Sequence, residues 1–202
     1  MSPQATPSEA NILAEMKRAW SDNQQFFSNA GKEERERWVV SEFLTYLPIS
    51  FDTYELRSHA QQSKVDVEFR GARFQVKEIP DPNFRRGDEI KSTYIRVMNA
   101  NTLQETVGPG FVYDVPPIVS GYDLVRDTAV DLAESETYKP HKATLDLLCY
   151  VTRTRASAIM AIDVRPEDFS ALGWRSITCL MGNQALVLFS TAGAPSFLHL
   201  PP

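Results

Sequence analysis

The sequence predicts an α/β (α+β) fold in which elements in the order α-β-β-β-α-β build a mixed central sheet, and three observations lead to this class. Polar and apolar residues alternate along residues 63–79 on both sides of Gly71, which predicts a β-hairpin. Residues 145–152, LDLLCYVT, form a nearly continuous apolar run, as expected of a central strand covered on both faces. Between them, residues 121–139 have the apolar spacing of a helix, so we expect a crossover helix that leads to a parallel strand.

Two helices and a strand are expected before the hairpin. Ser8 is the expected N-cap of a helix that continues to about Phe27. A second helix is expected to begin at Gly31 and to end at Pro48, because proline cannot continue a helix. Residues 51–57, FDTYELR, are the expected first strand. The expected apolar stripe of the second helix is Trp38, Val39, Phe43, Tyr46 and Leu47.

Glu42 falls within this stripe, four residues after Trp38 and four before Tyr46. An unpaired carboxylate at a buried position would be costly. Glu42 therefore either reaches solvent at the edge of the stripe, pairs with an arginine, or faces a functional site.

Residues 80–120 interrupt the regular order and are rich in proline, glycine and charge. A long irregular insertion in a compact domain is usually functional or mobile. Its basic and aromatic side chains would suit a flap that binds nucleic acid, because aromatic rings stack on bases and cations neutralise phosphates. A solvated insertion fits the composition equally well. The candidate nucleic-acid-binding residues are Arg85, Arg86, Lys91, Tyr94 and Arg96.

One domain is expected, because 202 residues with 43% hydrophobic content suffice for one well-buried core but not for two. Its C-terminal part should contain the segment SAIMAIDV, a short helix near residues 166–172 and a β-hairpin around Gly182. The expected organisation is a single domain over 1–202, with an N-terminal helical extension at 1–30, a core at 31–152 that contains the 80–120 insertion, and a C-terminal β-rich extension at 153–202.

Composition and charge favour a cytoplasmic protein that does not coat nucleic acid. The N-terminus lacks the basic and apolar regions of a signal peptide, and no apolar run approaches the roughly 20 residues that cross a bilayer. Cys149 and Cys179 lie in apolar stretches, as free buried cysteines do. The net charge is −5, yet residues 57–96 contain nine basic and six acidic residues. The basic excess therefore coincides with the hairpin and the segment after it.

The hairpin places an acid, an amide and a lysine on one predicted face. Its polar positions include Asp66, Glu68, Gln75 and Lys77. Two turns are open: a type I′ turn at residues 70–71 would place Asp66 opposite Gln75, and a type II′ turn at residues 71–72 would place it opposite Lys77. Directly opposed side chains stand about 4.5–5.5 Å apart at Cβ, close enough to share a cation or a phosphate.

This segment resembles the core of the PD-(D/E)xK nuclease superfamily, in which an Asp on one strand and an acid-x-Lys on the next bind a divalent metal and the scissile phosphate. The matching residues here are Asp66 and then Gln75-Val76-Lys77. The sequence departs from the pattern at Val65, where the family has proline, and at Gln75, where it has a second acid. The whole chain is also similar to a small bacterial family named as endonucleases of unknown function.

The resemblance implies a restriction-endonuclease-like core and a site for Mg²⁺ or Mn²⁺. It implies that Asp66, Gln75 and Glu42 are metal ligands, since such folds often have a glutamate on the helix before the strands. Lys77 would position the attacking water or neutralise the phosphate. The implied catalytic residues are Asp66, Gln75, Lys77 and Glu42, and Glu68 could compensate for the missing acid.

Two functional hypotheses follow from these observations. The first is a metal-dependent endonuclease that hydrolyses phosphodiester bonds of DNA. The second is a catalytically inactive module with a nuclease fold that binds nucleic acid or a protein partner, since one fold serves many functions. In the second case the hairpin face is solvated, and Glu68 forms an ordinary cross-strand ion pair with Arg73.

Overall fold

The computed structural model describes residues 8–60, 62–82, 86–108 and 117–199. The chain divides into two compact units, one from residues 1–32 and 83–115 and the other from residues 33–82 and 116–202. The predicted N-terminal extension and most of the predicted 80–120 insertion thus belong to the same unit. The prediction that residues 1–202 form a single domain stays a prediction.

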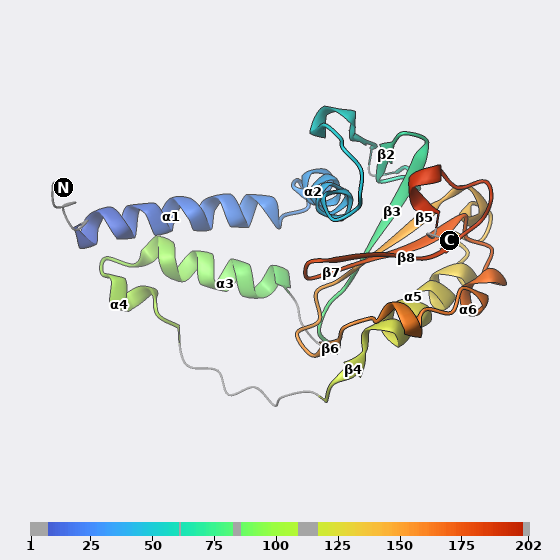
Figure 1. The fold of residues 1–202 in the computed structure, drawn as a ribbon. Helices are drawn as coiled ribbons and strands as arrows, with labels where there is room; N and C mark the ends of the chain where they lie inside the picture. The colour runs from blue at the N-terminus through green and yellow to red at the C-terminus, as the bar shows by residue number, and fades with distance from the viewer. Residues whose placement is uncertain (1–7, 61, 83–85, 109–116, 200–202) are drawn as a thin grey trace, which may run out of the picture. The chain divides into compact units, whose positions relative to one another are not determined.

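The first unit is helical. Helix α1 (Glu9–Phe26) begins where the sequence predicts, and the side chain of Ser8 accepts a hydrogen bond from the backbone N–H of Asn11 at 3.3 Å. Helix α3 (Arg86–Asn99) packs beside α1, and the short α4 (Leu103–Thr106) follows it (Figure 1). Much of the insertion is therefore helical and not irregular. The prolines and glycines on either side of this segment suggested an irregular loop, but the residues between them form an amphipathic helix in which Val97 is buried.

The second unit is built on a mixed six-stranded sheet with the strand order β1-β2-β3-β5-β7-β8 (Figure 1). Strands β3, β5 and β7 are parallel, and the remaining neighbours are antiparallel. The predicted mixed sheet, the parallel pairing of the apolar strand and the C-terminal hairpin are confirmed. The strands are β1 (Arg57–Ser58), β2 (Val67–Phe69), β3 (Ala72–Ile79), β5 (Asp146–Val151), β7 (Ser176–Met181) and β8 (Gln184–Ser190).

Helices cover both faces of this sheet. Helix α2 (Lys32–Thr45) packs on the face that contains Phe74, whose ring lies 6.0 Å from that of Phe43. Helices α5 (Gly121–Glu134) and α6 (Glu167–Ser170) pack on the other face (Figure 1). Because β5 is buried on both sides, its sequence is apolar at nearly every position.

The buried stripe of α2 differs from the predicted one. Trp38 and Tyr46 remain 43% and 44% exposed, whereas Val40 and Leu44 are fully buried. The helix is therefore rotated so that Glu42 lies beside the buried stripe and not within it. Its carboxylate is half-buried.

The predicted first strand is shorter than expected. Residues 53–55 form a 3₁₀ turn stabilised by a capping box between Asp52 and Glu55, which leaves only β1 as a strand. In the segment SAIMAIDV, Ser157 belongs to β6 (Ala156–Ser157), which pairs with β4 (Val119–Ser120), and residues 161–163 form a 3₁₀ turn. Among the helices described here, none combines the length and apolar character needed to cross a bilayer.

Candidate functional site

The turn of the hairpin decides which residue lies opposite Asp66. Arg70 and Gly71 have φ angles of 44° and 83°, as a type I′ turn requires at both central positions. The register pairs Val67 with Phe74, so the next position places Asp66 opposite Gln75. The backbone N–H of Asp66 accordingly donates to the Phe74 carbonyl at 2.8 Å. Of the two turns left open by the sequence, the first is confirmed.

Asp66 lies directly before the first residue of β2, and its carboxylate binds to β3. Its Oδ2 accepts a hydrogen bond from Gln75 Nε2 at 2.6 Å and another from the backbone N–H of Val76 at 2.8 Å. The side chain thus replaces the missing strand partner of Val76. Asp66 and Gln75 are only 5% and 7% exposed, so the pair lies in a largely buried position.

Lys77 lies two residues after Gln75 and is exposed. Because side chains alternate along a strand, Gln75 and Lys77 share the face opposite that of Phe74. Lys77 is paired in register with Cys149 of β5. Burial raises the pKa of the Cys149 thiol well above its usual range, and the charge of Lys77 partly opposes this shift. An exposed cation therefore stands on the same face as the buried Asp66–Gln75 pair.

Glu68 does not take the place of the missing acid. It lies directly opposite Arg73, with 3.9 Å between Arg73 Nε and Glu68 Oε1, and His59 Nε2 lies 3.3 Å from its other oxygen. These contacts are the ordinary cross-strand ion pair of the second hypothesis. Glu68 is therefore directed toward Arg73 and His59 in partly exposed contacts.

Glu42 is not brought onto the face of Gln75 and Lys77. It belongs to α2, which packs on the Phe74 face of the sheet. The structure therefore joins Asp66 to Gln75 and places Lys77 near them, but the expected convergence of four residues is not seen. The reason is that α2 covers the Phe74 face, so the sheet itself separates Glu42 from Gln75 and Lys77.

The oxygen atoms around Asp66 fit a divalent cation that arrives with a substrate phosphate. Mg²⁺ is usually bound through one or two carboxylates together with phosphates and waters. Asp66 offers the carboxylate, Gln75 an amide oxygen once its side chain turns over, and Val76 a carbonyl 3.3 Å from Gln75 Nε2. Among the described residues, no three His, Cys, Asp or Glu side chains are grouped to hold a metal ion.

The predicted nucleic-acid-binding residues belong to the first unit. Arg85 lies outside the described residues, and Arg86 is the first residue of α3. Lys91 is exposed and Tyr94 is half-buried on the same helix. Arg96 instead holds α3 to α4, because its Nε donates to the Thr106 carbonyl at 3.0 Å. Of the predicted residues whose burial is described, Lys91 is thus the exposed cation.

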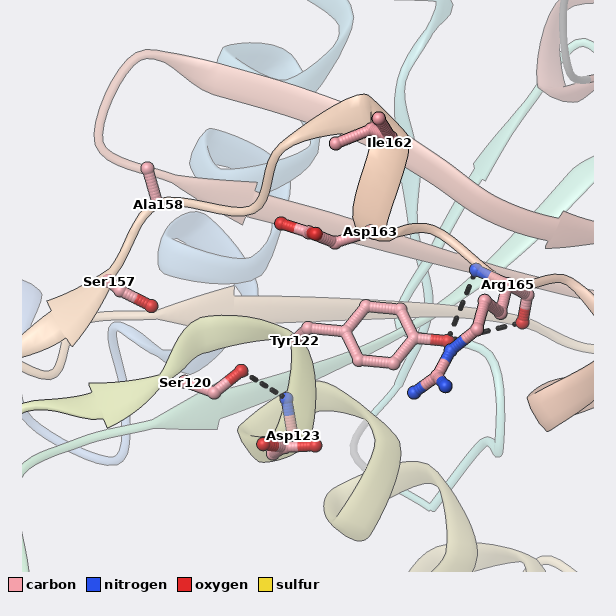
Figure 2. A pocket seen from close by; sticks show the side chains of 8 residues that line it. All are labelled: Ser120, Tyr122, Asp123, Ser157, Ala158, Ile162, Asp163 and Arg165. Atoms are coloured by element: carbon pink, nitrogen blue, oxygen red, sulfur yellow. Dashed lines mark hydrogen bonds between the residues drawn. The ribbon is translucent and has the colours of Figure 1, made fainter.

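A pocket of about 540 Å³ lies at the N-terminus of α5 in the second unit. Figure 2 shows Tyr122 at its centre, with the hydroxyl directed toward Arg165. That hydroxyl lies 3.0 Å from Asp168 Oδ2, and burial followed by this contact raises the pKa of Tyr122. A Cβ at Gly121 would meet the Ser157 carbonyl at 2.5 Å, so only glycine fits there. The polar lining residues are Ser120, Tyr122, Asp123, Ser157, Asp163 and Arg165.

Sequence analysis did not identify this pocket or two arginines near it. The pocket combines short polar segments from both sides of β5, which no local pattern links. Arg153 and Arg155, however, directly follow the apolar strand, and ligands of open α/β sheets commonly bind beyond the carboxyl ends of parallel strands. The basic run TRTR directly after the apolar strand LDLLCYV could therefore have indicated a candidate anion-binding position in the sequence.

Comparisons with known proteins give a family and a similar fold. Among solved structures, the chain resembles a protein of unknown function from Pseudomonas aeruginosa strain PAO1 described as monooxygenase superfamily, with a TM-score of 0.58 and 25% identity over 95% of this chain and 91% of that chain. No curated protein matches the sequence. The model of one family matches residues 8–200, and the chain therefore belongs to the family described as "Putative endonuclease, protein of unknown function (DUF1780)".

Proposed function

We propose that the protein is an endonuclease that hydrolyses phosphodiester bonds of DNA at the face formed by Asp66, Gln75 and Lys77. The observation that supports this proposal most is the direct opposition of Asp66 and Gln75 on a hairpin whose second strand exposes Lys77. The family description points to the same class of reaction. The similarity to the PD-(D/E)xK superfamily at these three positions supports it further.

The residues of this face would divide the work as follows. Asp66 and the amide oxygen of Gln75 would hold Mg²⁺ or Mn²⁺, and such a cation neutralises the scissile phosphate and lowers the pKa of an attacking water. Lys77 would donate a hydrogen bond to a phosphate oxygen and stabilise the charge that develops there. The hydrogen bond from the Val76 N–H keeps the Asp66 carboxylate in place before substrate arrives.

A specific observation favours the second candidate, an inactive nuclease-fold module that binds nucleic acid or a protein partner. Gln75 presents its NH₂ group to Asp66 at 2.6 Å, and this bond has to break before the amide can serve as a metal ligand. The name of the solved neighbour also suggests a third class, the monooxygenases. The arrangement of the hairpin supports phosphate chemistry more directly than oxygenation.

The test compares Mn²⁺ binding and plasmid cleavage in three proteins. Calorimetric titration should detect Mn²⁺ binding to the parent and tighter binding to Gln75→Glu, because the substitution adds a carboxylate to the donors. Asp66→Ala should lose both metal binding and cleavage. Each carboxylate that leaves a catalytic cation typically costs orders of magnitude in rate, so we expect at least a roughly 100-fold loss of cleavage.

Glu68→Gln is the matched control, because it removes a carboxylate from the same hairpin but away from Gln75. It should keep the metal affinity and cleavage of the parent. If neither the folded parent nor folded Gln75→Glu binds Mn²⁺, the endonuclease proposal is wrong and the inactive module replaces it. Equal losses in Glu68→Gln and Asp66→Ala would show that any negative charge on the hairpin suffices.

A further inference from the structure

The loop after β5 is a fixed platform that contains two arginines, Arg153 and Arg155. The N–H of Thr152 donates to the Ile79 carbonyl at 3.0 Å, and its hydroxyl donates to Glu78 at 2.8 Å. The neighbouring Thr154 donates both its N–H and its hydroxyl to the Asp81 carboxylate. These bonds attach the loop to the end of β3 on the one side.

On its other side the loop is attached to β4. The carbonyl of Arg155 accepts a hydrogen bond from the Val119 N–H at 3.0 Å, and the β4–β6 pairing begins at the next residue. The backbone on both sides of the two arginines is thus fixed by main-chain and side-chain bonds. A fixed backbone limits the positions that the two guanidinium groups can reach.

Both arginines have a buried donor without an acceptor. The Nε atoms of Arg153 and Arg155 are removed from solvent, and neither finds a hydrogen-bond partner in the described parts of the chain. Asp81, which follows β3 and contacts this loop, accepts its printed hydrogen bonds from Thr154. Other arginines of this unit behave differently, because each of the following has a carboxylate within 4 Å: Arg70, Arg73, Arg126, Arg165 and Arg175.

An unsatisfied buried donor on a cation is unfavourable in the free protein and becomes favourable when an anion supplies the acceptor. The two arginines also lie beyond the carboxyl end of β5, where open α/β sheets commonly bind ligands. Lys77 is level with Cys149, four residues before Arg153. Strand β5 ends at Val151, so Arg153 follows two residues beyond the end of the strand that pairs with Lys77.

We propose that Arg153 and Arg155 bind the phosphodiester backbone of DNA on one side of the Lys77 face and position the strand there. This inference rests on the proposed function for the identity of the anion. Arginine suits the role because its fork of donors can bind two phosphate oxygens at once. The two arginines would position the DNA strand, whereas Asp66, Gln75 and Lys77 would carry out the hydrolysis.

The test measures binding of a fluorescently labelled DNA duplex by anisotropy, in EDTA, over a range of salt concentrations. The variant Arg153→Gln/Arg155→Gln should bind roughly 10-fold or more weakly, since each arginine donates charged hydrogen bonds. The slope of log K against log salt should fall by about 1 for each phosphate that the variant no longer neutralises. The melting temperature should stay close to that of the parent, because neither Nε has a hydrogen-bond partner to lose and the Gln amide occupies the same position along the side chain.

The matched control is Arg70→Gln/Arg126→Gln, which removes two positive charges that already have carboxylate partners. A second variant, Arg153→Lys/Arg155→Lys, keeps both charges and should retain the salt slope while its affinity falls in part. Equal weakening in the control double variant, or parental affinity in Arg153→Gln/Arg155→Gln, would overturn the proposed backbone site.

Binding and cleavage together separate this inference from the proposed function. A parent that binds DNA through the two arginines but does not cleave it with Mn²⁺ supports the backbone site and refutes hydrolysis. If the parent and Arg153→Gln/Arg155→Gln cleave DNA equally well, hydrolysis is supported and the backbone site is refuted. A parent that does not bind DNA refutes both.

Discussion

Asp146 and Asp66 are two buried carboxylates of the same sheet, and their surroundings differ. Asp146 is fully buried and accepts bonds from the Arg73 N–H at 2.7 Å, from the Ser176 hydroxyl at 2.8 Å and from the Arg175 guanidinium. Asp66 is 5% exposed, and its donors include the backbone N–H of Val76 and the amide of Gln75. One carboxylate faces a fixed cation, and the other faces a side chain that can exchange its donor for an acceptor.

This difference separates a structural acid from a candidate functional one. The bonds of Asp146 connect β3, β5 and β7, and Arg175 also donates to the Gly71 carbonyl at 3.0 Å in the hairpin turn. Every bond there joins elements of the fold. The amide of Gln75, in contrast, contributes little to connecting strands that the ladder already joins, so its contact with Asp66 can change without loss of the sheet.

The largest effect on stability is expected for Asp146→Ala. The substitution would leave Arg175, whose side chain is only 16% exposed, without its carboxylate. Removing one partner of a buried pair costs about 3–5 kcal/mol, and we expect the lower part of this range because Arg175 keeps some contact with water. Urea unfolding followed by circular dichroism measures the loss.

Asp127→Ala is the control for this prediction, because Asp127 is 66% exposed and lies 2.9 Å from Arg126 in a surface pair. Its unfolding midpoint should barely change. If Asp146→Ala were as stable as this control, Asp146 would not be the structural member of the comparison.

A smaller and pH-dependent effect is expected for the stability of Gln75→Glu. The new carboxyl would lie against Asp66 at the distance now spanned by the 2.6 Å bond, so the pair should share a proton and have a raised pKa. Stability from this proton is present at low pH and is lost as the pH rises through the raised pKa. The unfolding free energy of Gln75→Glu should therefore match that of the parent at about pH 5. At about pH 8 it should be about 1–3 kcal/mol lower than that of the parent.

Mn²⁺ sharpens this second prediction, because a bound cation would replace the shared proton. Urea unfolding at about pH 8 should show that Mn²⁺ restores much of the stability that Gln75→Glu removes. A deficit that is independent of both pH and Mn²⁺ would mean that the new acid has moved away from Asp66. The opposition of the two residues would then be less rigid than their burial indicates.

The sequence predicted the hairpin, its face and the central parallel strand because each depends on local alternation or on a continuous apolar run. It did not predict the pair of Asp146 and Arg175, which are separated by 29 residues and meet only after β5 and β7 align. The rotation of α2 was mispredicted for a related reason. Trp38 and Val40 are both apolar, and only packing against Phe74 and Leu148 determines which of them is buried.

The smallest effect is expected in the turn that places Asp66 opposite Gln75. Arg70 has a φ of 44°, a conformation that asparagine adopts more readily than arginine, and Asn-Gly is the favoured pair of a type I′ turn. Arg70→Asn also removes the exposed ion pair with Glu55 at 2.7 Å, which contributes little in water. We therefore expect the melting temperature to rise by roughly 2 °C, with the Mn²⁺ affinity of the Asp66 face unchanged. Glu55→Gln, which removes the ion pair and leaves the turn intact, isolates the backbone contribution. A melting temperature of Arg70→Asn below that of Glu55→Gln would show that Arg70 stabilises the turn through contacts other than this pair, and the register of Asp66 would then depend on the arginine itself.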